Sequence, residues 1–326
     1  MYMNLNEKYY IILVNFNAWK DTVECLESIR ESSYKNIQTI IVDNCSQDDS
    51  LTLMKKEFDE ENIKYISYKS SEILEDNLSL EDSSNDGAVI IIQTEENRGF
   101  AAGNNIGIKY AKFKNDSAGV ILLNNDTIVE KSAFENLIKS KKQNENPAIY
   151  SGKVLYYSEP ETIWFDGGQL NYLFGKTSHI GYDKKNVNSD QKIKEVNFIT
   201  FCYVLIPFEV LNKVGFLDES YFMYFEDTDY CYKVTRNAFH QYIVENSIIY
   251  HKVGKSSGGK FSPFLFYWYY RNFIVFNRRR RDVLKFLSLF IITLSRPLIF
   301  LKIFLRNKEN AKRMLKATID GYKYKI

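Results

Sequence analysis

The sequence predicts an α/β fold in which helices flank a mostly parallel sheet. Three apolar runs of strand length, at 9–15, 37–43 and 119–123, are rich in Ile, Val and Leu and are typical of strands buried on both faces. A helical pattern separates the first two runs, and polar residues follow each of the three directly. Strands that alternate with helices favour a parallel sheet with right-handed crossovers, and such sheets bind ligands at their carboxyl edge.

The first part of the chain alternates strands with helices. Residues 19–30 place apolar side chains at helical spacing on one face, as an amphipathic helix does. The run Ser46-Gln47-Asp48-Asp49 has the form of a capping box, so a second helix is expected to start there. The expected elements of this part are strands at 9–15, 37–43, 62–68, 88–93 and 119–123, and helices at 19–30, 46–59, 97–112 and 131–142.

The second part of the chain mixes strands with shorter helices. Pro207 stands where a helix begins after an apolar strand, since its ring suits the first turn. Within the first part, residues 70–86 are rich in Ser, Asp, Glu and Asn and are expected to form a solvated loop or insertion. The expected elements of the second part are strands at 147–156, 196–206 and 242–250, a turn at 164–168, and a helix that ends near 237.

Length and composition limit the class of protein. The chain has 326 residues and 45% hydrophobic content, enough for one large domain or two ordinary ones. Its four cysteines form no CxxC pair and no Cys/His ladder, which gives no support to a zinc site or a disulfide scaffold. Free thiols and the lack of a signal-peptide pattern lead us to expect a cytoplasmic protein.

Charge is unevenly distributed along the chain. Residues 278–326 contain fourteen Lys/Arg and three Asp/Glu, a net charge of +11, whereas the whole chain carries only +2, so the remainder carries −9. This asymmetry indicates that the C-terminal tail meets an anionic surface. The acidic remainder argues against nucleic acid, and the apolar run at 286–305 favours lipid. Arg278 to Arg281 alone would also suit a solvated helix face.

The apolar run at 286–305 is expected to lie on a membrane rather than to cross it. A spanning helix needs about 20 predominantly apolar residues. Arg296, Pro297 and Lys302 interrupt the run. An amphipathic helix in the plane of the membrane fits this pattern better.

The most informative stretch follows the strand at 119–123. Asn124-Asn125-Asp126 comes directly after it, where a parallel sheet presents its ligands. An Asn-x-Asp pair supplies hard oxygen ligands that suit Mg²⁺ or Mn²⁺ bound to a diphosphate. The alternative is an ordinary turn, since Asn and Asp are also common turn residues.

Four clusters of carboxylates and amides stand at or near expected strand ends, so we expect them to converge on one crevice. A carboxylate at the second strand end can accept hydrogen bonds from a base or ribose, and a later carboxylate can act as a general base. For Glu226 and Asp227, the alternative is that they form the charged first turn of a helix. The clusters are Asn15/Asn17, Asp43/Asn44, Asn124/Asp126 and Glu226/Asp227.

Five motifs of the sequence resemble those of glycosyltransferase family 2 and occur in the same order as in that family. The family consists of inverting enzymes with the GT-A fold. The closest resemblance is to its bacterial rhamnosyltransferase-like branch, which builds surface polysaccharides. Asp166-Gly167-Gly168, and His251 followed by Gly254 and Ser256, also resemble that branch. The resemblance covers roughly 9–257. Its motifs are Val14-Asn15-Phe16-Asn17, Val42-Asp43-Asn44-Cys45-Ser46, Asn97-Arg98-Gly99-Phe100, Leu123-Asn124-Asn125-Asp126 and Tyr224-Phe225-Glu226-Asp227-Thr228-Asp229.

The resemblance implies a role for each matching residue. Asp227 would be the base that deprotonates the acceptor hydroxyl, and Asp126 would bind a divalent metal, Mg²⁺ or Mn²⁺. His251 would be a further metal ligand or would contact the diphosphate. Asn124 stands where the family commonly has an Asp, which weakens this position as a metal ligand. The residues implied for the nucleotide sugar are Asn15, Asn17, Asp43, Asn44, Arg98, Gly99, Asn105, Asn124 and Asn125, and those for the acceptor are Trp164, Asp166, Gly167 and Glu226.

The resemblance also implies a domain plan and partners. A GT-A domain would span 1–260, with a nucleotide-sugar half at 1–130 and an acceptor half at 131–260, and a membrane-associating tail would span 261–326. The expected donor is dTDP-rhamnose, otherwise a UDP-hexose. The expected acceptor is a saccharide, carried on a polyprenyl diphosphate. The expected location is the cytoplasmic face of the cell membrane, with no nucleic acid as partner.

Two rival functions are weaker. A dinucleotide-dependent oxidoreductase needs a glycine-rich turn after its first strand, and 15–21 contains no glycine. A non-catalytic, membrane-docked assembly protein of the same fold would not need Asp126 and Asp227, both of which are present.

Overall fold

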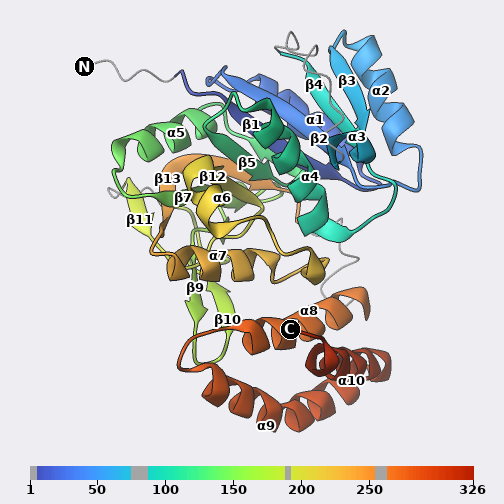
Figure 1. The fold of residues 1–326 in the computed structure, drawn as a ribbon, viewed down its shortest axis with the longest axis vertical. Coiled ribbons are helices and arrows are strands. Elements are labelled where there is room, and N and C mark those ends of the chain that lie inside the picture. Colours follow the sequence, from blue (N-terminus) through green and yellow to red (C-terminus); the bar gives the residue numbers. More distant parts are fainter. Residues whose placement is uncertain (1–5, 75–86, 188–191, 254–262) are drawn as a thin grey trace.

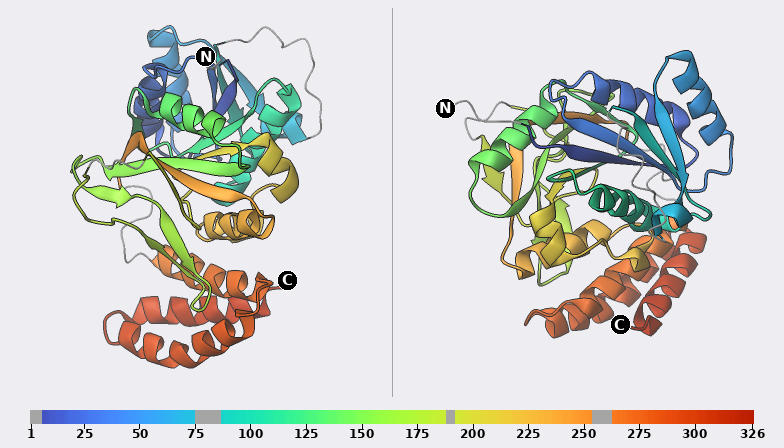
Figure 2. Two further views of the ribbon diagram at one scale, coloured as in Figure 1. Left: turned by 90° about the vertical axis from the view of Figure 1, so that its left-hand side faces the viewer. Right: turned by 45° about the horizontal axis from the view of Figure 1, so that its top comes forward.

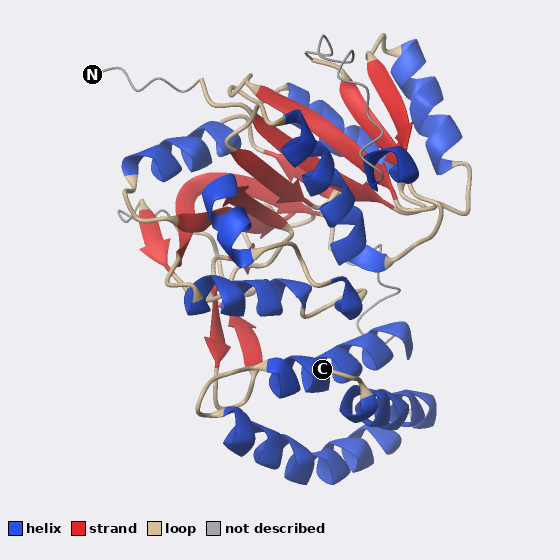
Figure 3. Ribbon diagram, in the orientation of Figure 1, coloured by secondary structure: helices blue, strands red, loops and turns tan. Residues whose placement is uncertain are grey.

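A computed structural model of the chain describes residues 6–74, 87–187, 192–253 and 263–326. A central sheet with helices on both of its faces forms the upper part of Figure 1, and three helices form a layer at the other end of the molecule. Figure 3, coloured by secondary structure, shows the same division between the sheet-containing part and the helical layer. Within the described residues, eleven strands belong to one sheet, in agreement with the predicted α/β class.

The half of the sheet built by the first part of the chain is entirely parallel. Its spatial order is β3-β4-β2-β1-β5, as expected for strands linked by helical crossovers. The apolar runs at 9–15, 37–43 and 119–123 form three adjacent strands of it, as predicted. The strand bounds are β1 Tyr9–Asn15, β2 Ile37–Asp43, β3 Tyr65–Lys69, β4 Val89–Gln93 and β5 Gly119–Leu123.

The helices of this half are α1 (Trp19–Arg30), α2 (Ser50–Glu60), α3 (Ser70–Leu74) and α4 (Gly99–Lys114). The predicted start of α2 at Ser46 is wrong, because the Ser46 hydroxyl bonds back to Asp43 and does not cap the helix. The predicted loop at 70–86 begins instead with α3, and its remainder lies outside the described residues.

The half of the sheet built by the second part of the chain is mixed. β12 (Tyr203–Pro207) lies antiparallel between β5 and β7 (Ala148–Tyr156), and β13 (His240–His251) runs parallel to β7. Shorter strands complete this half: β6 Thr127–Val129, β8 Ile163–Phe165 and β11 Ile193–Glu195. Its helices are α5 Ala133–Gln143, α6 Phe208–Val214, the 3₁₀ turn η2 Glu219–Tyr221 and α7 Glu226–Arg236.

The strand expected at 196–206 is shorter than predicted. Its first residues leave the ladder because Ile199 exchanges hydrogen bonds with the Cys231 thiol of α7 at 3.3 Å. The Cys202 carbonyl then accepts a hydrogen bond from Asn124 N at 2.9 Å. The segment before β12 therefore joins α7 to the turn that carries Asp126.

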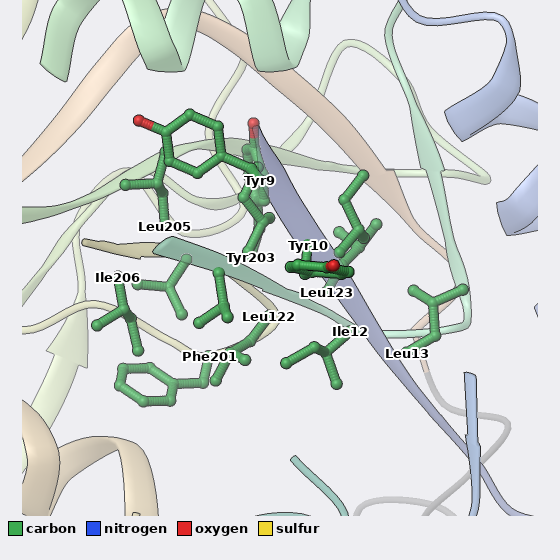
Figure 4. Packing of buried hydrophobic residues seen from close by; sticks show 14 of the residues in the cluster. Tyr9, Tyr10, Ile12, Leu13, Leu122, Leu123, Phe201, Tyr203, Leu205 and Ile206 are labelled. Carbon is green, nitrogen blue, oxygen red and sulfur yellow. The ribbon is translucent and has the colours of Figure 1, made fainter. Parts of the chain in front are cut away.

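The main core lies around β1, β5 and β12, as the close view in Figure 4 shows. Residues Tyr9 to Leu13 are fully buried, which matches the prediction of a strand covered on both faces. The helix α4 packs closely on β1 at Gly107, where a Cβ would lie 2.7 Å from Ile12 Cγ2. This close approach holds the start of α4 near the carboxyl ends of β1 and β2.

The helical layer consists of α8 (Pro263–Arg279), α9 (Lys285–Phe304) and α10 (Lys308–Lys323). A separate hairpin, β9 (Gly168–Asn171) and β10 (Lys176–His179), reaches from the sheet to these helices (Figure 2). A second apolar cluster joins the layer to the hairpin, η2 and α7: Leu170, Tyr221, Phe225, Tyr232, Phe273, Ile274, Val275, Phe276 and Ile292.

The helix α9 is long and apolar enough to cross a membrane by length and composition alone, and little of it is buried. It carries Pro297 inside and follows a curved path in Figure 1. Its inner residues, Ser288, Ile292 and Arg296, are buried at a spacing of four. The outer face carries exposed Phe and Leu side chains, so the helix is amphipathic, as the sequence predicts.

Candidate active site

The carboxyl ends of β1 and β2 carry a buried amide and a buried carboxylate that contact each other. Asn15 and Asp43 end their strands and lie opposite each other in register. Asn15 Nδ2 donates to Asp43 Oδ1 at 2.8 Å, and the Ser46 hydroxyl donates to the same oxygen at 2.6 Å. Ser46 N also donates to Asp43 Oδ2 at 3.2 Å. The Asp43 carboxylate is therefore held in one orientation at the edge of the sheet.

Thr22, near the start of α1, joins this pair to the turn after β5. Its hydroxyl donates to Asn15 Oδ1 at 2.9 Å and accepts from Asn125 Nδ2 at 2.8 Å. The sequence analysis missed Thr22. Its position was a usable signal, because its hydroxyl lies on the buried face of α1, the helix that follows Asn15. The exposed Asn17 accepts from Gln47 N at 2.7 Å and so ties together the loops after β1 and β2.

The loop after β2 is fastened to the start of α4. Asn44 Nδ2 donates to Asn97 Oδ1 at 3.0 Å and to the Gly99 carbonyl at 3.1 Å. Gly99 has a φ of +89°, and a Cβ there would lie 2.1 Å from the Phe222 carbonyl oxygen. Phe100 N donates to that same carbonyl at 2.8 Å. Glycine is therefore required at 99 because the loop before α7 passes directly against this backbone.

Arg98, directly before α4, and Asn105, within α4, occupy different environments. The Arg98 side chain is half-exposed, and its guanidinium donates to Glu219 Oε2 at 2.9 Å. Asn105 is buried, and its amide bonds to both backbone groups of Leu217 at 2.9 and 3.1 Å and to Glu219 Oε1 at 3.0 Å. Since its amide is occupied inside the protein, we assign Asn105 to positioning the loop before α7 and not to nucleotide contact.

Asp126 and His251 form a buried pair at the ends of β5 and β13. His251 Nε2 lies 3.1 Å from Asp126 Oδ1, and β6 brings the two residues together by pairing Thr127 with His251. Burial lowers the pKa of His251, but the neighbouring Cys202 and Asp126 raise it by more, so its pKa lies above the ordinary value. His251 Nδ1 is buried and has no hydrogen-bond partner among the described residues.

The Asp126–His251 pair fits a divalent cation that is shared with a ligand. A carboxylate oxygen and an imidazole nitrogen are both ligands of Mn²⁺, and Mg²⁺ accepts the carboxylate. No cluster of three His, Cys, Asp or Glu side chains able to hold a metal occurs in the described part of the chain. Asn124, half-buried beside the pair, offers only a neutral amide. A cation here would therefore need phosphate or water oxygens to complete its coordination.

The three residues predicted at 164–167 for the acceptor separate in the structure. Trp164 packs edge-on against the His251 ring, with centroids 4.6 Å apart, and so lies at the Asp126–His251 pair. Asp166 is buried and pairs with Lys194 at 2.6 Å, which in turn pairs with Glu245 at 2.9 Å. Asp166 therefore belongs to an internal ion network, and we assign it a structural role.

Gly167 is also buried and has a φ of +86°. A Cβ at this position would lie 2.8 Å from Val196 Cγ1. The glycine thus allows the turn after β8 to pack closely inside the protein, and we assign it a structural role as well.

Glu226 and Asp227 lie in the first turn of α7, not at a strand end. This location agrees with the helical alternative that the sequence left open. Phe225, directly before the helix, has a φ of +75°. Asp227 Oδ1 accepts from Thr228 N at 2.6 Å and from the Thr228 hydroxyl at 3.1 Å. Asp227 is half-buried, whereas Glu226 is buried and its Oε2 has no hydrogen-bond partner among the described residues.

The two carboxyl groups differ in their protonation. Burial, together with the charge of Asp227, raises the pKa of Glu226 to about 8. Burial also raises the pKa of Asp227, to about 6, while hydrogen bonds from Thr228 oppose this rise. At neutral pH, Asp227 is therefore ionised and able to accept a proton, and Glu226 is protonated.

Asn272 of α8 holds the loop that leads to Glu226 and Asp227. Its fully buried amide Nδ2 donates to the carbonyls of Tyr221 at 2.5 Å, Met223 at 2.8 Å and Tyr224 at 3.0 Å. Three residues of this loop adopt positive φ: Phe222, Tyr224 and Phe225. The sequence analysis missed Asn272, although an amide within an aromatic helix was a usable signal. The helical layer is therefore part of the framework of the site.

Comparison with known proteins decides the family. A family model described as glycosyl transferase family 2 matches residues 10–72 and 67–215. The chain belongs to glycosyl transferase family 2. The matched region of this family 2 chain contains the Asn15–Asp43 pair, Asp126 and the start of α4. The helix α7 and the helical layer lie after the matched region in the sequence.

Two curated relatives are glycosyltransferases by name. The low-salt glycan biosynthesis hexosyltransferase Agl10 of Haloferax volcanii is 28% identical over 44% of this chain and 46% of its own length. Glycosyltransferase GlyG of Streptococcus pneumoniae is 24% identical over 65% of this chain and 60% of its own length. The family 2 chain thus spans about half the length of the curated relatives it matches.

Solved structures share the fold. GalNAc-T7, determined with UDP, GalNAc and Mn²⁺, superposes with a TM-score of 0.63 at 15% identity, over 87% of this chain and 49% of that chain. The mannosyltransferase PcManGT of Pyrobaculum calidifontis, in complex with GDP-Man and Mn²⁺, gives a TM-score of 0.53 at 11% identity, over 98% of this chain and 76% of that chain. The family 2 chain therefore has the predicted GT-A fold.

Replacing Glu226 by Gln should change how stability depends on pH. The folded state keeps the Glu226 proton at pH values where the unfolded chain, near its ordinary pKa of 4.5, has lost it. Stability should therefore fall as the pH rises from the ordinary value through about 8, by about 1.4 kcal/mol for each pH unit between the two pKa values. Glu226→Gln has no such proton and should melt at a higher temperature than the wild type above pH 8.

Thermal melts across this pH range provide the measurement, with Glu61→Gln at the exposed end of α2 as the matched control. The control should follow the wild type at every pH. Parallel curves for Glu226→Gln and the wild type would contradict the assignment of a protonated Glu226.

Asn272→Ala should destabilise the protein and lower activity. The substitution leaves three carbonyls, one buried and two partly buried, without their donor, which we expect to cost about 1–3 kcal/mol of unfolding free energy. Asn272→Asp, which keeps the shape but cannot donate, should cost at least as much. Chemical denaturation measures the change, with Asn237→Ala as control, because Asn237 also donates to a backbone carbonyl but at the exposed end of α7. Equal effects at 272 and 237 would count against the proposed clamp.

Proposed function

We propose that this chain is an active glycosyltransferase that moves a sugar from a nucleotide diphosphate donor to a hydroxyl group of a saccharide acceptor. The observation that carries the proposal is the arrangement at one edge of the sheet. There the Asn15–Asp43 pair lies beside the turn that carries Asp126, Asp126 contacts His251 at the end of β13, and Thr22 links Asn15 to Asn125 of the same turn. The loop before Asp227 packs against this edge through Gly99.

On the donor side, the Asn15–Asp43 pair supplies an oriented carboxylate for a base or ribose. Asn17 and Arg98 are exposed at the rim, where the guanidinium can exchange Glu219 for a phosphate group. Complexes of two proteins of this fold with UDP and with GDP-Man support a nucleotide diphosphate sugar as donor. We propose dTDP-rhamnose ahead of a UDP-hexose, because the Asn124-x-Asp126 pair resembles the rhamnosyltransferase-like branch.

Asp126 and His251 would hold a divalent metal, Mn²⁺ or Mg²⁺, on the donor diphosphate. When bound, the metal acts as a Lewis acid that neutralises the charge of the leaving diphosphate. The presence of Mn²⁺ in both cited complexes supports this assignment. Asp126 contributes the negative charge of the site, and Trp164 packs on the His251 ring and holds it in place.

On the acceptor side, Asp227 removes the proton from the attacking hydroxyl. The acceptor oxygen forms a bond to the anomeric carbon from the face opposite the diphosphate, the carbon–oxygen bond to the diphosphate breaks, and the configuration inverts. The hydroxyl proton passes to Asp227, which is ionised at neutral pH. Protonated Glu226 can donate a hydrogen bond beside it, and Trp164 offers an aromatic face for a sugar ring.

The acceptor is proposed to be carried on a lipid at the cytoplasmic face of a membrane. The exposed apolar side chains of α9 and the basic residues around it support an in-plane contact with an anionic membrane surface. In this arrangement residues 1–260 form the catalytic part, with its nucleotide-sugar half at 1–130 and its acceptor half at 131–260. Residues 261–326 then form the membrane-associating part, whose helix α8 also holds the loop before Asp227 through Asn272.

Asp126→Ala should remove most of the Mn²⁺-dependent binding of a UDP- or dTDP-sugar, because the cation loses its charged protein ligand. Asn124→Asp should strengthen Mn²⁺ binding, since a carboxylate replaces a neutral amide. Isothermal titration calorimetry with and without Mn²⁺ measures both effects. Asp49→Ala, a change at an exposed carboxylate before α2, should leave binding unaltered. Unchanged donor affinity in Asp126→Ala would overturn the metal assignment.

Asp227→Asn should lower sugar transfer by about 10²–10⁴-fold, the usual contribution of a positioned base. Donor affinity should change little, because the side chain acts on the acceptor hydroxyl. Initial transfer rates with a saccharide acceptor, together with donor titrations, separate the two effects. Glu226→Gln should cost less in rate and serves as the neighbouring comparison. Near-normal transfer in Asp227→Asn would identify another base, and a loss of donor binding equal to the loss of rate would move Asp227 to the nucleotide side.

A further inference from the structure

A cavity of about 160 Å³ lies in the helical layer, outside the candidate active site. The hairpin β9–β10, α8 and α9 enclose it. Its lining combines basic, aromatic and aliphatic side chains and, in the part of the chain that the structure describes, contains no carboxylate. The lining residues are Phe174, Lys176, Tyr269, Tyr270, Phe273, Ile291, Ile292, Ser295, Arg296 and Ile299. The cavity is therefore apolar in its walls and positive in its charge.

Arg296 is the unusual residue of this cavity. The side chain is only 8% exposed, and its guanidinium lies 5.1 Å from the ring centroids of both Tyr270 and Phe273. Its Nε and Nη2 are buried and have no hydrogen-bond partner among the described residues. Contact with two rings offsets part of the lost hydration, but a buried cation without an acceptor stays costly. This guanidinium therefore has unused capacity to bind an anion.

Lys176 of β10 supplies a second positive charge. Its ammonium lies 5.8 Å from the centroid of the same Phe273 ring, and the side chain is exposed at the entrance. A planar guanidinium and an ammonium on the lining of one cavity favour phosphate as a ligand, since the guanidinium can bond two phosphate oxygens at once.

The outer face of α9 indicates what carries the phosphate. Exposed Phe and Leu side chains recur there at intervals of three or four residues, and their exposed fractions range from 53% at Leu301 to 79% at Phe286. A continuous apolar stripe of this kind on a basic helix is typical of contact with a membrane surface. Arg296 lies on the inner face of the same helix, directly behind the stripe. The remaining members of the stripe are Phe290, Leu294, Leu298 and Leu305.

We propose that this cavity binds the phosphate head of a lipid phosphate, with Arg296 and Lys176 on the phosphate oxygens. Ile291 and Ile299 line the part of the cavity that would receive the first carbons of the hydrocarbon chain. The binding needs no covalent step and does not depend on the sugar transfer proposed above. The cavity thus gives α9 a specific lipid ligand, in addition to the general attraction of its basic residues to an anionic membrane surface.

The test uses the full chain and three soluble probes: dodecyl phosphate, inorganic phosphate and dodecyl maltoside. The two dodecyl compounds are used below their critical micelle concentrations. Calorimetry should show dodecyl phosphate binding at least about tenfold more tightly than either comparison probe, which corresponds to about 1.4 kcal/mol. Equal binding of inorganic phosphate would show a free-anion site and overturn the lipid assignment. Equal binding of dodecyl maltoside would show a site for the hydrocarbon chain alone.

Variants separate a built site from diffuse attraction. Arg296→Gln should weaken dodecyl phosphate binding about tenfold or more, Arg296→Lys should restore part of it, and the exposed Lys302→Gln on the same helix should have little effect. Equal losses in Arg296→Gln and Lys302→Gln would contradict a specific site.

If Arg296→Gln does not fold, Lys176→Gln, at an exposed position, provides the decisive comparison with Lys302→Gln. A loss of dodecyl phosphate binding in Lys176→Gln alone supports the proposal. Unchanged binding in Lys176→Gln refutes it.

Discussion

The pairing of β1 with β2 is the constraint on which the rest of the structure depends. The two strands pair over their full length, and their last residues, Asn15 and Asp43, lie opposite each other. Because β1 is covered on both faces, a shift in its register would move the amide of Asn15 into an apolar core without its partners. Burial of the strands thus places the polar pair at the carboxyl edge. The bonds from Thr22 and Ser46 then carry this placement to α1 and to the loop after β2.

The helical layer depends on the sheet, and the acceptor side of the site depends on the helical layer. Aromatic residues of α8 pack on Phe225, and Asn272 bonds three carbonyls of the loop before α7. The positive φ values of that loop cost backbone energy, which these contacts offset. If α9 rests on a membrane, as we propose, the same loop is coupled to the membrane through α8. Membrane association and orientation of Asp227 would then share one structural element.

Two of the buried ionisable groups border the places where we propose that ligands bind. Glu226 and Arg296 are both buried, and both retain polar atoms without hydrogen-bond partners among the described residues. Each lies beside aromatic side chains, where desolvation raises the free energy of a charge. The first borders the proposed base Asp227, and the second borders the cavity behind α9. Such groups lower folding stability unless a ligand satisfies them, which agrees with the ligands proposed for these two places.

The sequence by itself determined the strand-forming runs and the polar residues that follow them, because buried strands and their ends have a local signature. The bounds of β1, α1 and β2 were predicted correctly for this reason. Only the tertiary structure decided which polar residues face inward. Asn105 and Asp166 looked like ligand contacts in sequence, but their partners, Leu217 and Lys194, are distant in the chain. The same holds for Asn272, whose partners lie about fifty residues earlier. Spacing along the chain cannot show such partners, because they are set by packing between elements.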